Sequence, residues 1–178
     1  MTDFEFQPVL ENKVIRIHPL APGDFEALYQ VASDPLIWEQ HPNKNRYQRD
    51  VFQNFFQGAL ESGGAFMVYA KESGKLIGSS RYCEWKPEEG SVSIGYTFLS
   101  KDHWGGKYNP ALKALMLDHA FRFARRVIFH IGAINVRSQK AIERLGARKT
   151  GEAEIAYYGE PGKLNFIYEI TRDDWTRR

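Results

Sequence analysis

The sequence predicts a mixed α/β or α+β fold in which helices pack on a central sheet. Three strand-like segments follow one another between residues 65 and 99, and helix-like segments with apolar residues at helical spacing precede and follow them. The chain has 178 residues, of which 43% are apolar and 14% aromatic, enough for the core of one compact domain. We therefore expect residues 1–178 to form a single domain.

The first elements are expected before these strands. Residues 12–20 alternate apolar and polar side chains, which is typical of a strand. Residues 22–33 have apolar side chains at helical spacing, and Asp24 is a suitable N-cap. Residues 33–47 contain two prolines and predict a loop. Residues 49–62 repeat apolar side chains at helical spacing and stop at two glycines, so they predict an amphipathic helix.

The central strands are expected at residues 65–71, 75–85 and 91–99. The polar turns between them favour an antiparallel meander. Residues 110–126 then place apolar side chains on one broad face with a polar stripe opposite, as in an amphipathic helix. Residues 127–134 predict a further strand.

The last elements are a helix and a hairpin. Residues 137–146 predict a short helix that Gly146 terminates as a C-terminal cap. Residues 152–159 and 163–171 flank a turn that contains glycine and proline, so they predict an antiparallel hairpin.

Composition argues against several classes of function. The net charge of +2 gives no signature of polyanion binding, so we expect no nucleic-acid partner. No apolar run is long enough to span a membrane, so we expect no membrane partner. Cys83 is the only cysteine and residues 1–13 lack a signal-peptide core, so we expect a cytoplasmic location. The five histidines show no metal-ligand spacing, and no metal is expected.

The octapeptide HWGGKYNP, residues 103–110, lies between a predicted strand and a predicted helix. Asn109 is a favourable N-cap and Pro110 fits the first helical position, so the helix is expected to begin here. Helix N-termini present unpaired N–H groups that bind phosphate, and Gly105 and Gly106 leave room for a ligand to approach. The octapeptide is therefore either an anion-binding loop or a simple turn.

Basic side chains are concentrated beyond this loop. Residues 122–149 contain eight Arg or Lys residues, and Glu143 is their only acidic neighbour. This charge fits a polyphosphate ligand, and it fits a solvated basic face equally well.

Two segments together resemble one known family. Residues 93–121 contain a strand, a glycine turn and a helix start, and residues 134–152 contain an Asn-x-x-Ser helix start 26 residues after Asn109. This combination is similar to the core of the GNAT acyl-CoA N-acyltransferases. Similarity is greatest to the branch that includes the ribosomal-protein N-terminal acetyltransferases, and it extends over most of the chain.

The resemblance implies a mostly antiparallel sheet flanked by helices, with a strand at 91–99 that splays from the strand at 127–134. The gap would admit the pantetheine arm of acetyl-CoA, which the resemblance implies as co-substrate. The residues that match the family's cofactor site are Phe98, Leu99, Trp104, Gly105, Gly106, Lys107, Tyr108, Asn109, Asn135 and Ser138.

Three positions depart from the family pattern. Lys107 stands where a glycine is usual, and a positive φ there would cost about 1 kcal/mol. Ile142 stands where many members have a tyrosine that acts as general acid. Ser93 stands where an acidic residue is common.

The chemistry that the family implies is direct attack of an amine on the acetyl thioester. It needs a neutral amine, a polarised carbonyl and a proton for the departing thiolate. Ser138 is the candidate proton donor, with ordering of its helix start as the alternative role. Glu84 is the candidate base, with simple surface exposure as the alternative. Tyr96 faces either the cleft, as a catalytic candidate, or the core.

The early loop and the last hairpin flank the acceptor cleft in this family. The matching candidates for substrate binding are Trp38, His41, Arg46, Arg81, Tyr157 and Tyr158. The two arginines could bind a substrate carboxylate in a bidentate manner. Structural packing of the aromatic residues and surface ion pairs of the arginines remain open.

The resemblance thus implies an acetyl-CoA-dependent N-acetyltransferase that acts on a primary amine, either a peptide N-terminus or a small amine. Homodimers are common in the family, so a homodimer is a possible state. The departures at Ile142 and Ser93 keep an alternative open. It is a catalytically weak protein of the same fold that binds CoA or a protein partner.

Overall fold

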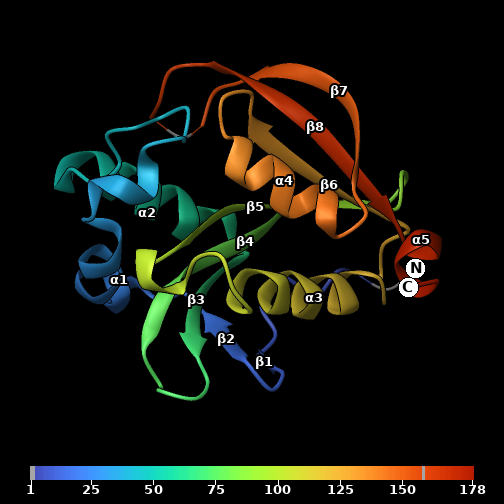
Figure 1. Ribbon diagram of the computed structural model, residues 1–178, viewed down its shortest axis with the longest axis horizontal. Coiled ribbons are helices and arrows are strands. Elements are labelled where there is room, and N and C mark those ends of the chain that lie inside the picture. Colours follow the sequence, from blue (N-terminus) through green and yellow to red (C-terminus); the bar gives the residue numbers. More distant parts are fainter. Residues whose placement is uncertain (1–2, 158) are drawn as a thin grey trace.

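The computed structural model describes residues 3–157 and 159–178. Its centre is an eight-stranded sheet in the order β1–β2–β3–β4–β5–β6–β8–β7 (Figure 1). The strands are β1 (Leu10–Glu11), β2 (Ile15–Pro19), β3 (Ala65–Ala70), β4 (Leu76–Lys86), β5 (Ser91–Leu99), β6 (Arg126–Gly132), β7 (Arg148–Ile155) and β8 (Lys163–Thr171). The helices are α1 (Phe25–Ala32), α2 (Arg49–Ser62), α3 (Tyr108–Ala120), α4 (Val136–Arg144) and α5 (Arg172–Thr176).

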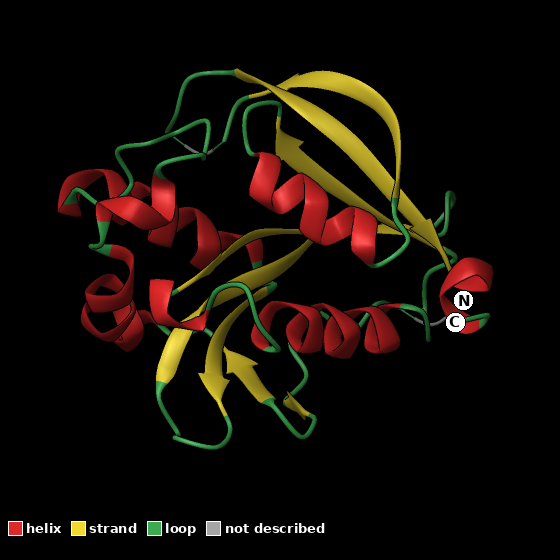
Figure 2. Ribbon diagram, viewed as in Figure 1, coloured by secondary structure: helices red, strands yellow, loops and turns green. Residues whose placement is uncertain are grey.

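Helices cover both faces of this sheet because strands such as β3 are apolar on both sides. Successive strand residues face opposite ways. Phe66 and Val68 belong to the core that contains α3 and α4, whereas Ala65 and Met67 belong to the core that contains α1 and α2. In Figure 2 the strands of the final hairpin, β7 and β8, arch over α4.

The two strands in the middle of the sheet separate along their length. The pairing of β5 with β6 is the one parallel pairing among the described strands, and it ends at Ser93 and Ile128. Beyond this point β5 stays paired with β4, and β6 stays paired with β8. The predicted splay is confirmed, and it opens the sheet between two strands that are each held on their other edge.

A β-bulge lies in β5 beside this opening. Ser79 pairs with Phe98 and Arg81 pairs with Gly95, so β5 has one residue more than β4 in this interval. Tyr96, inside the bulge, takes a φ of +56°, which is uncommon for a residue other than glycine. Strained backbone of this kind tends to be retained at functional sites.

Most of the predicted elements are confirmed. The helix predicted over residues 49–62 is α2, and the predicted meander is β3–β4–β5. The predicted start of the helix at Asn109 and Pro110 is wrong, because α3 begins at Tyr108 with Lys107 as its N-cap. Pro110 is tolerated at the third helical position, because N–H groups in the first turn have no intrahelical acceptor.

Short elements and element ends account for the other differences. α3 ends at Ala120 rather than at residue 126, and β7 begins at Arg148 rather than at residue 152. β1 and α5 were not expected, because five residues or fewer carry no clear periodicity. Across residues 3–157 and 159–178, no helix has the length and apolar character that crossing a bilayer would need.

Candidate functional site

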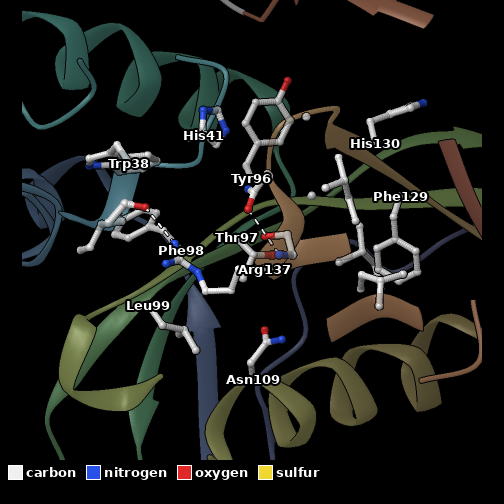
Figure 3. Close-up of a pocket in the computed structure, with 18 of the residues that line it drawn as sticks. Trp38, His41, Tyr96, Thr97, Phe98, Leu99, Asn109, Phe129, His130 and Arg137 are labelled. Carbon is white, nitrogen blue, oxygen red and sulfur yellow. Dashed lines mark hydrogen bonds between the residues drawn. The ribbon is translucent and has the colours of Figure 1, made fainter. Parts of the chain in front are cut away.

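A cavity of about 190 Å³ lies where β5 and β6 separate (Figure 3). Residues 94–99 of β5 form one wall and residues 129–132 of β6 form another. The N-terminal halves of α3 and α4, the loop before α3, the segment between α1 and α2, and Tyr157 complete the lining. The site is therefore built at the opening in the sheet.

The separated strand edges offer backbone hydrogen-bonding groups to this cavity. Residues 94–99 have no β6 neighbour on one edge, and residues 129–132 have no β5 neighbour. Buried backbone N–H and C=O groups normally find partners, so these edges suit an extended ligand with amide groups. Phe98 and Leu99, two predicted cofactor residues, lie on the β5 edge.

The loop before α3 presents three consecutive amides. The backbone N–H groups of Gly105, Gly106 and Lys107 donate to no acceptor within the described part of the chain. They lie at the start of a helix of 13 residues, where the helix dipole favours an anion. Gly105 takes a φ of +67°, which glycine adopts without strain. The loop thus offers backbone donors at a helix start, where an anion is favoured.

Lys107 does not line the cavity. Its φ is −80°, so the strain considered for this position does not arise. Its ammonium group lies 3.5 Å from Glu72, and its side chain is 58% exposed. Of the predicted loop residues, the cavity is lined by Trp104, Gly105 and Asn109 and not by Gly106, Lys107 and Tyr108.

The start of α4 brings two further predicted residues to the cavity. Asn135 is the N-cap of α4, and its side chain accepts a hydrogen bond of 3.3 Å from the backbone N–H of Ser138. The Ser138 hydroxyl has no hydrogen-bond partner among the residues that the structure describes, although both residues line the cavity. Ile142, one turn further along α4, also lines the cavity. This isoleucine occupies the position where the family resemblance led us to look for a tyrosine.

Lys113 lines the cavity from α3 and was not predicted. It is 5% exposed, and its ammonium group donates a hydrogen bond of 2.5 Å to the Thr97 hydroxyl. No carboxylate of the described residues forms an ion pair with it. Burial lowers the pKa of Lys113 from 10.5 to about 7. Its spacing of four residues from Asn109, on the same helix face, was the available signal.

Glu84 lies outside the cavity. Its side chain is 55% exposed and accepts a hydrogen bond of 3.0 Å from the Ser93 hydroxyl. His130 does line the cavity, and its Nδ1 atom lies 3.8 Å from a carboxylate oxygen of Glu84. Glu84 therefore does not reach the cavity itself but contacts His130, which lines it.

His41, a predicted acceptor residue, and Tyr96, a catalytic candidate, lie at the opposite end of the cavity from Asn109 (Figure 3), which we call the acceptor end. Arg46 is 1% exposed and forms a bidentate ion pair with Glu160, at 2.6 and 3.0 Å. A third nitrogen of Arg46 lies 3.2 Å from Nε2 of His41. Tyr157 lies across this end with its ring centre 5.1 Å from that of Tyr96.

Two other acceptor candidates are buried against neighbouring groups. Trp38 is 2% exposed, and its indole N–H donates to the backbone oxygen of Ala32 at 2.8 Å, although one edge reaches the cavity. Arg81 does not line the cavity; its guanidinium carbon lies 3.6 Å from the centre of the Tyr96 ring. Tyr158 lies outside the described residues.

Comparison with known proteins agrees with this architecture. The profile of the Acetyltransferase (GNAT) domain matches residues 15–148. No curated protein matches the chain by sequence.

Similar folds occur in several solved structures. A GCN5-related N-acetyltransferase from Brucella melitensis has a TM-score of 0.82 and 19% identity, over 96% of this chain and 81% of that one. RimJ from Mycobacterium smegmatis, in complex with CoA-disulfide, has a TM-score of 0.71 and 17% identity, over 94% of this chain and 88% of that one. Spermidine N-acetyltransferase from Vibrio cholerae, in complex with CoA and spermine, has a TM-score of 0.70 and 15% identity, over 93% of this chain and 99% of that one. At these identities the likeness concerns the fold, whereas the domain profile covers most of the sequence. The chain therefore belongs to the GNAT acetyltransferase family.

Proposed function

We propose that this protein transfers the acetyl group of acetyl-CoA to a primary amine, either of a small molecule or of a peptide N-terminus. One observation carries the proposal: the cavity at the opened edges of β5 and β6 adjoins a loop with three free amides. An extended arm with amide groups and a pyrophosphate is the kind of ligand that this combination suits.

The residues that would hold acetyl-CoA follow from the chemistry of its parts. The pyrophosphate would take the amides of residues 105–107, and the pantetheine arm would lie along Phe98 and Leu99. Asn135 and Ser138 line the cavity further from the loop, where the thiol end would lie. When bound, acetyl-CoA supplies an acyl group already activated as a thioester.

The acceptor amine would attack the thioester carbon and displace the thiolate. Backbone N–H groups at the bulge in β5 would stabilise the oxyanion, a contribution of several kcal/mol in other acyl transfers. Ser138, whose hydroxyl is unengaged by any described residue, would donate a proton to the departing thiolate. Glu84 would act on the amine proton through His130 or through water, because it does not reach the cavity itself.

A second function remains a candidate because of two observations. Ile142 lines the cavity where many family members have a tyrosine, and none of the lining residues within the described chain is an aspartate or glutamate. A protein that binds CoA, or only a protein partner, without acetylating an amine would share these features.

Thiol release in the presence of acetyl-CoA and a panel of amines and peptides distinguishes the two functions. The proposal predicts amine-dependent release of CoA with a matching acetylated product by mass spectrometry. Calorimetric binding of acetyl-CoA without turnover on any amine would favour the CoA-binding function. An absence of binding at millimolar acetyl-CoA would contradict the proposed acetyl transfer and would leave only a protein partner for the second function.

A further inference from the structure

Two buried guanidinium groups, those of Arg46 and Arg81, lie near the acceptor end of the cavity, and of the two only Arg46 has a carboxylate partner among the described residues. Glu160, with a side chain that is 5% exposed, uses both oxygens to bind Arg46. Arg81 is 4% exposed, and its Nε and Nη2 atoms find no acceptor among the described residues. No ion pair to Arg81 is present in that part of the chain. One positive charge is therefore left without a counter-ion.

The neighbouring titratable groups do not compensate this charge. Burial, and then the Arg46 charge, hold the pKa of His41 well below its usual value, so His41 is neutral at pH 7. Burial raises the pKa of Tyr96 and of Tyr157 above their usual value, and it raises the pKa of Cys83 to about 12. These side chains therefore stay uncharged, and the cluster keeps its net positive charge.

The uncompensated charge lies directly behind the cavity wall. Tyr96 lines the cavity and Arg81 does not, while the Arg81 guanidinium carbon lies 3.6 Å from the Tyr96 ring centre. A ligand group that packed on the ring face opposite Arg81 would lie roughly 7 Å from the charge, allowing for contact on both faces. At an effective dielectric constant of about 20, this separation changes binding by about tenfold to a hundredfold.

We propose that the acceptor is a primary amine that also carries a carboxylate, which binds at the end of the cavity formed by His41, Arg46 and Tyr96, in front of Arg81. This inference rests on the proposed acetyltransferase function. A carboxylate would supply the missing negative charge, and Arg46 retains donor hydrogens that Glu160 does not use. A polyamine would add positive charge to a cluster that already has an excess.

Matched amines test this proposal. Glycine, β-alanine and γ-aminobutyrate are compared with their carboxamides, and glutamate-first peptides with glutamine-first peptides, at saturating acetyl-CoA. We expect kcat/KM to be at least about tenfold higher for the carboxylate in at least one pair. The pair with the largest ratio reports the distance from amine to carboxylate and whether the carboxylate belongs to a peptide side chain. Ratios near one in every pair, or faster turnover of spermidine, would overturn the proposal.

Variants assign the effect to Arg81. In Arg81→Met the ratio of kcat/KM between the carboxylate and its carboxamide is expected to fall toward one. Arg81→Lys keeps the positive charge, so most of the carboxylate preference should remain. Arg16→Met, at an exposed position in β2, is the matched control and should leave the ratio unchanged. If Arg81→Met does not fold, Arg81→Lys and the paired amines still decide the question.

Binding measurements separate this proposal from the proposed function. Each amine of a pair is titrated into the protein saturated with CoA, and heat is measured. Tighter binding of the carboxylate supports the proposal even if no amine is turned over, which would refute acetyl transfer alone. Equal binding of both members in every pair overturns the proposal, whatever the activity.

Discussion

Replacement of Lys113 by methionine should stabilise the protein, most strongly at and below about pH 7. Lys113 is 5% exposed, and its one described side-chain partner is the neutral hydroxyl of Thr97. Burial lowers its pKa from 10.5 to about 7, so folding at pH 7 either strips a proton from the amine or buries a charge. Methionine has a similar length and carries no charge, and it would remove this penalty.

The size of the effect follows from the pKa difference. Each pKa unit corresponds to about 1.4 kcal/mol, so a fall from 10.5 to about 7 is worth at most about 5 kcal/mol. Loss of the hydrogen bond to Thr97 subtracts about 1 kcal/mol, and water in the cavity beside Lys113 reduces the penalty further. We therefore expect a gain of about 2 kcal/mol in the free energy of unfolding at pH 7.

The gain should depend on pH with a defined sign. Between pH 7 and 10.5 the unfolded state binds more protons at Lys113 than the folded state, so the wild-type protein becomes more stable as pH rises. The penalty is complete below about pH 7 and disappears above about pH 10.5. The advantage of Lys113→Met should therefore shrink by up to about 1.4 kcal/mol per pH unit between these limits.

Urea unfolding at pH 7, 8 and 9 measures this dependence. Lys107→Met is the matched control, because Lys107 lies at the start of the same helix with its side chain 58% exposed. An advantage of Lys113→Met that is absent at pH 7, or equal at all three pH values, would refute the reasoning. Lys113 would then be charged at neutral pH with a pKa close to its ordinary value.

Three further predictions concern other parts of the site. Ser138→Ala should lower kcat by about a hundredfold, as expected for a lost general acid, with an unchanged KM for acetyl-CoA and an unchanged melting temperature. A fall in the melting temperature together with kcat would indicate a structural role for Ser138. Glu160→Gln should lower the free energy of unfolding by about 3 kcal/mol, because Arg46 is left buried without a counter-ion; urea titration would show a change below 1 kcal/mol if Arg46 were free to find water. Lys107→Ala should change the Kd for acetyl-CoA by less than about threefold, a weak effect for an exposed ion-pairing residue; a tenfold loss by calorimetry would show that Lys107 turns toward the phosphates.

Local patterns in the sequence predicted much of the fold. The spacing of apolar residues marked α2 well, and the strand segments between polar turns marked the meander. The splay of β5 from β6 came from family resemblance, because strand pairing depends on residues far apart in the chain. The helix start was predicted two residues too late, because Asn109–Pro110 is a strong local signal for a helix start, whereas α3 begins at Tyr108.

The candidate site was less predictable because its decisive contacts join distant segments. Arg46 and Glu160 are 114 residues apart, and no local pattern indicates that they pair. Lys113 reads as a surface residue until the fold places it against Thr97 at the cavity. Gly105 and Ser138, which were predicted to bind the cofactor, both line the cavity, and they could be singled out because turns and caps have local sequence requirements.

Hydrogen exchange with and without acetyl-CoA tests the central claim most directly, that the opened edge of β5 and the loop before α3 form the cofactor site. The backbone amides of residues 105–107, and those of residues 94–99 that face the opened edge, should exchange more slowly in the complex, because they become hydrogen-bond donors to the pyrophosphate and the pantetheine arm. The hairpin turn between β3 and β4, which lies outside the cavity lining, should exchange at the same rate in both states. Acetyl-CoA binding that leaves both protected segments unchanged, or protection confined to other elements, would contradict the account.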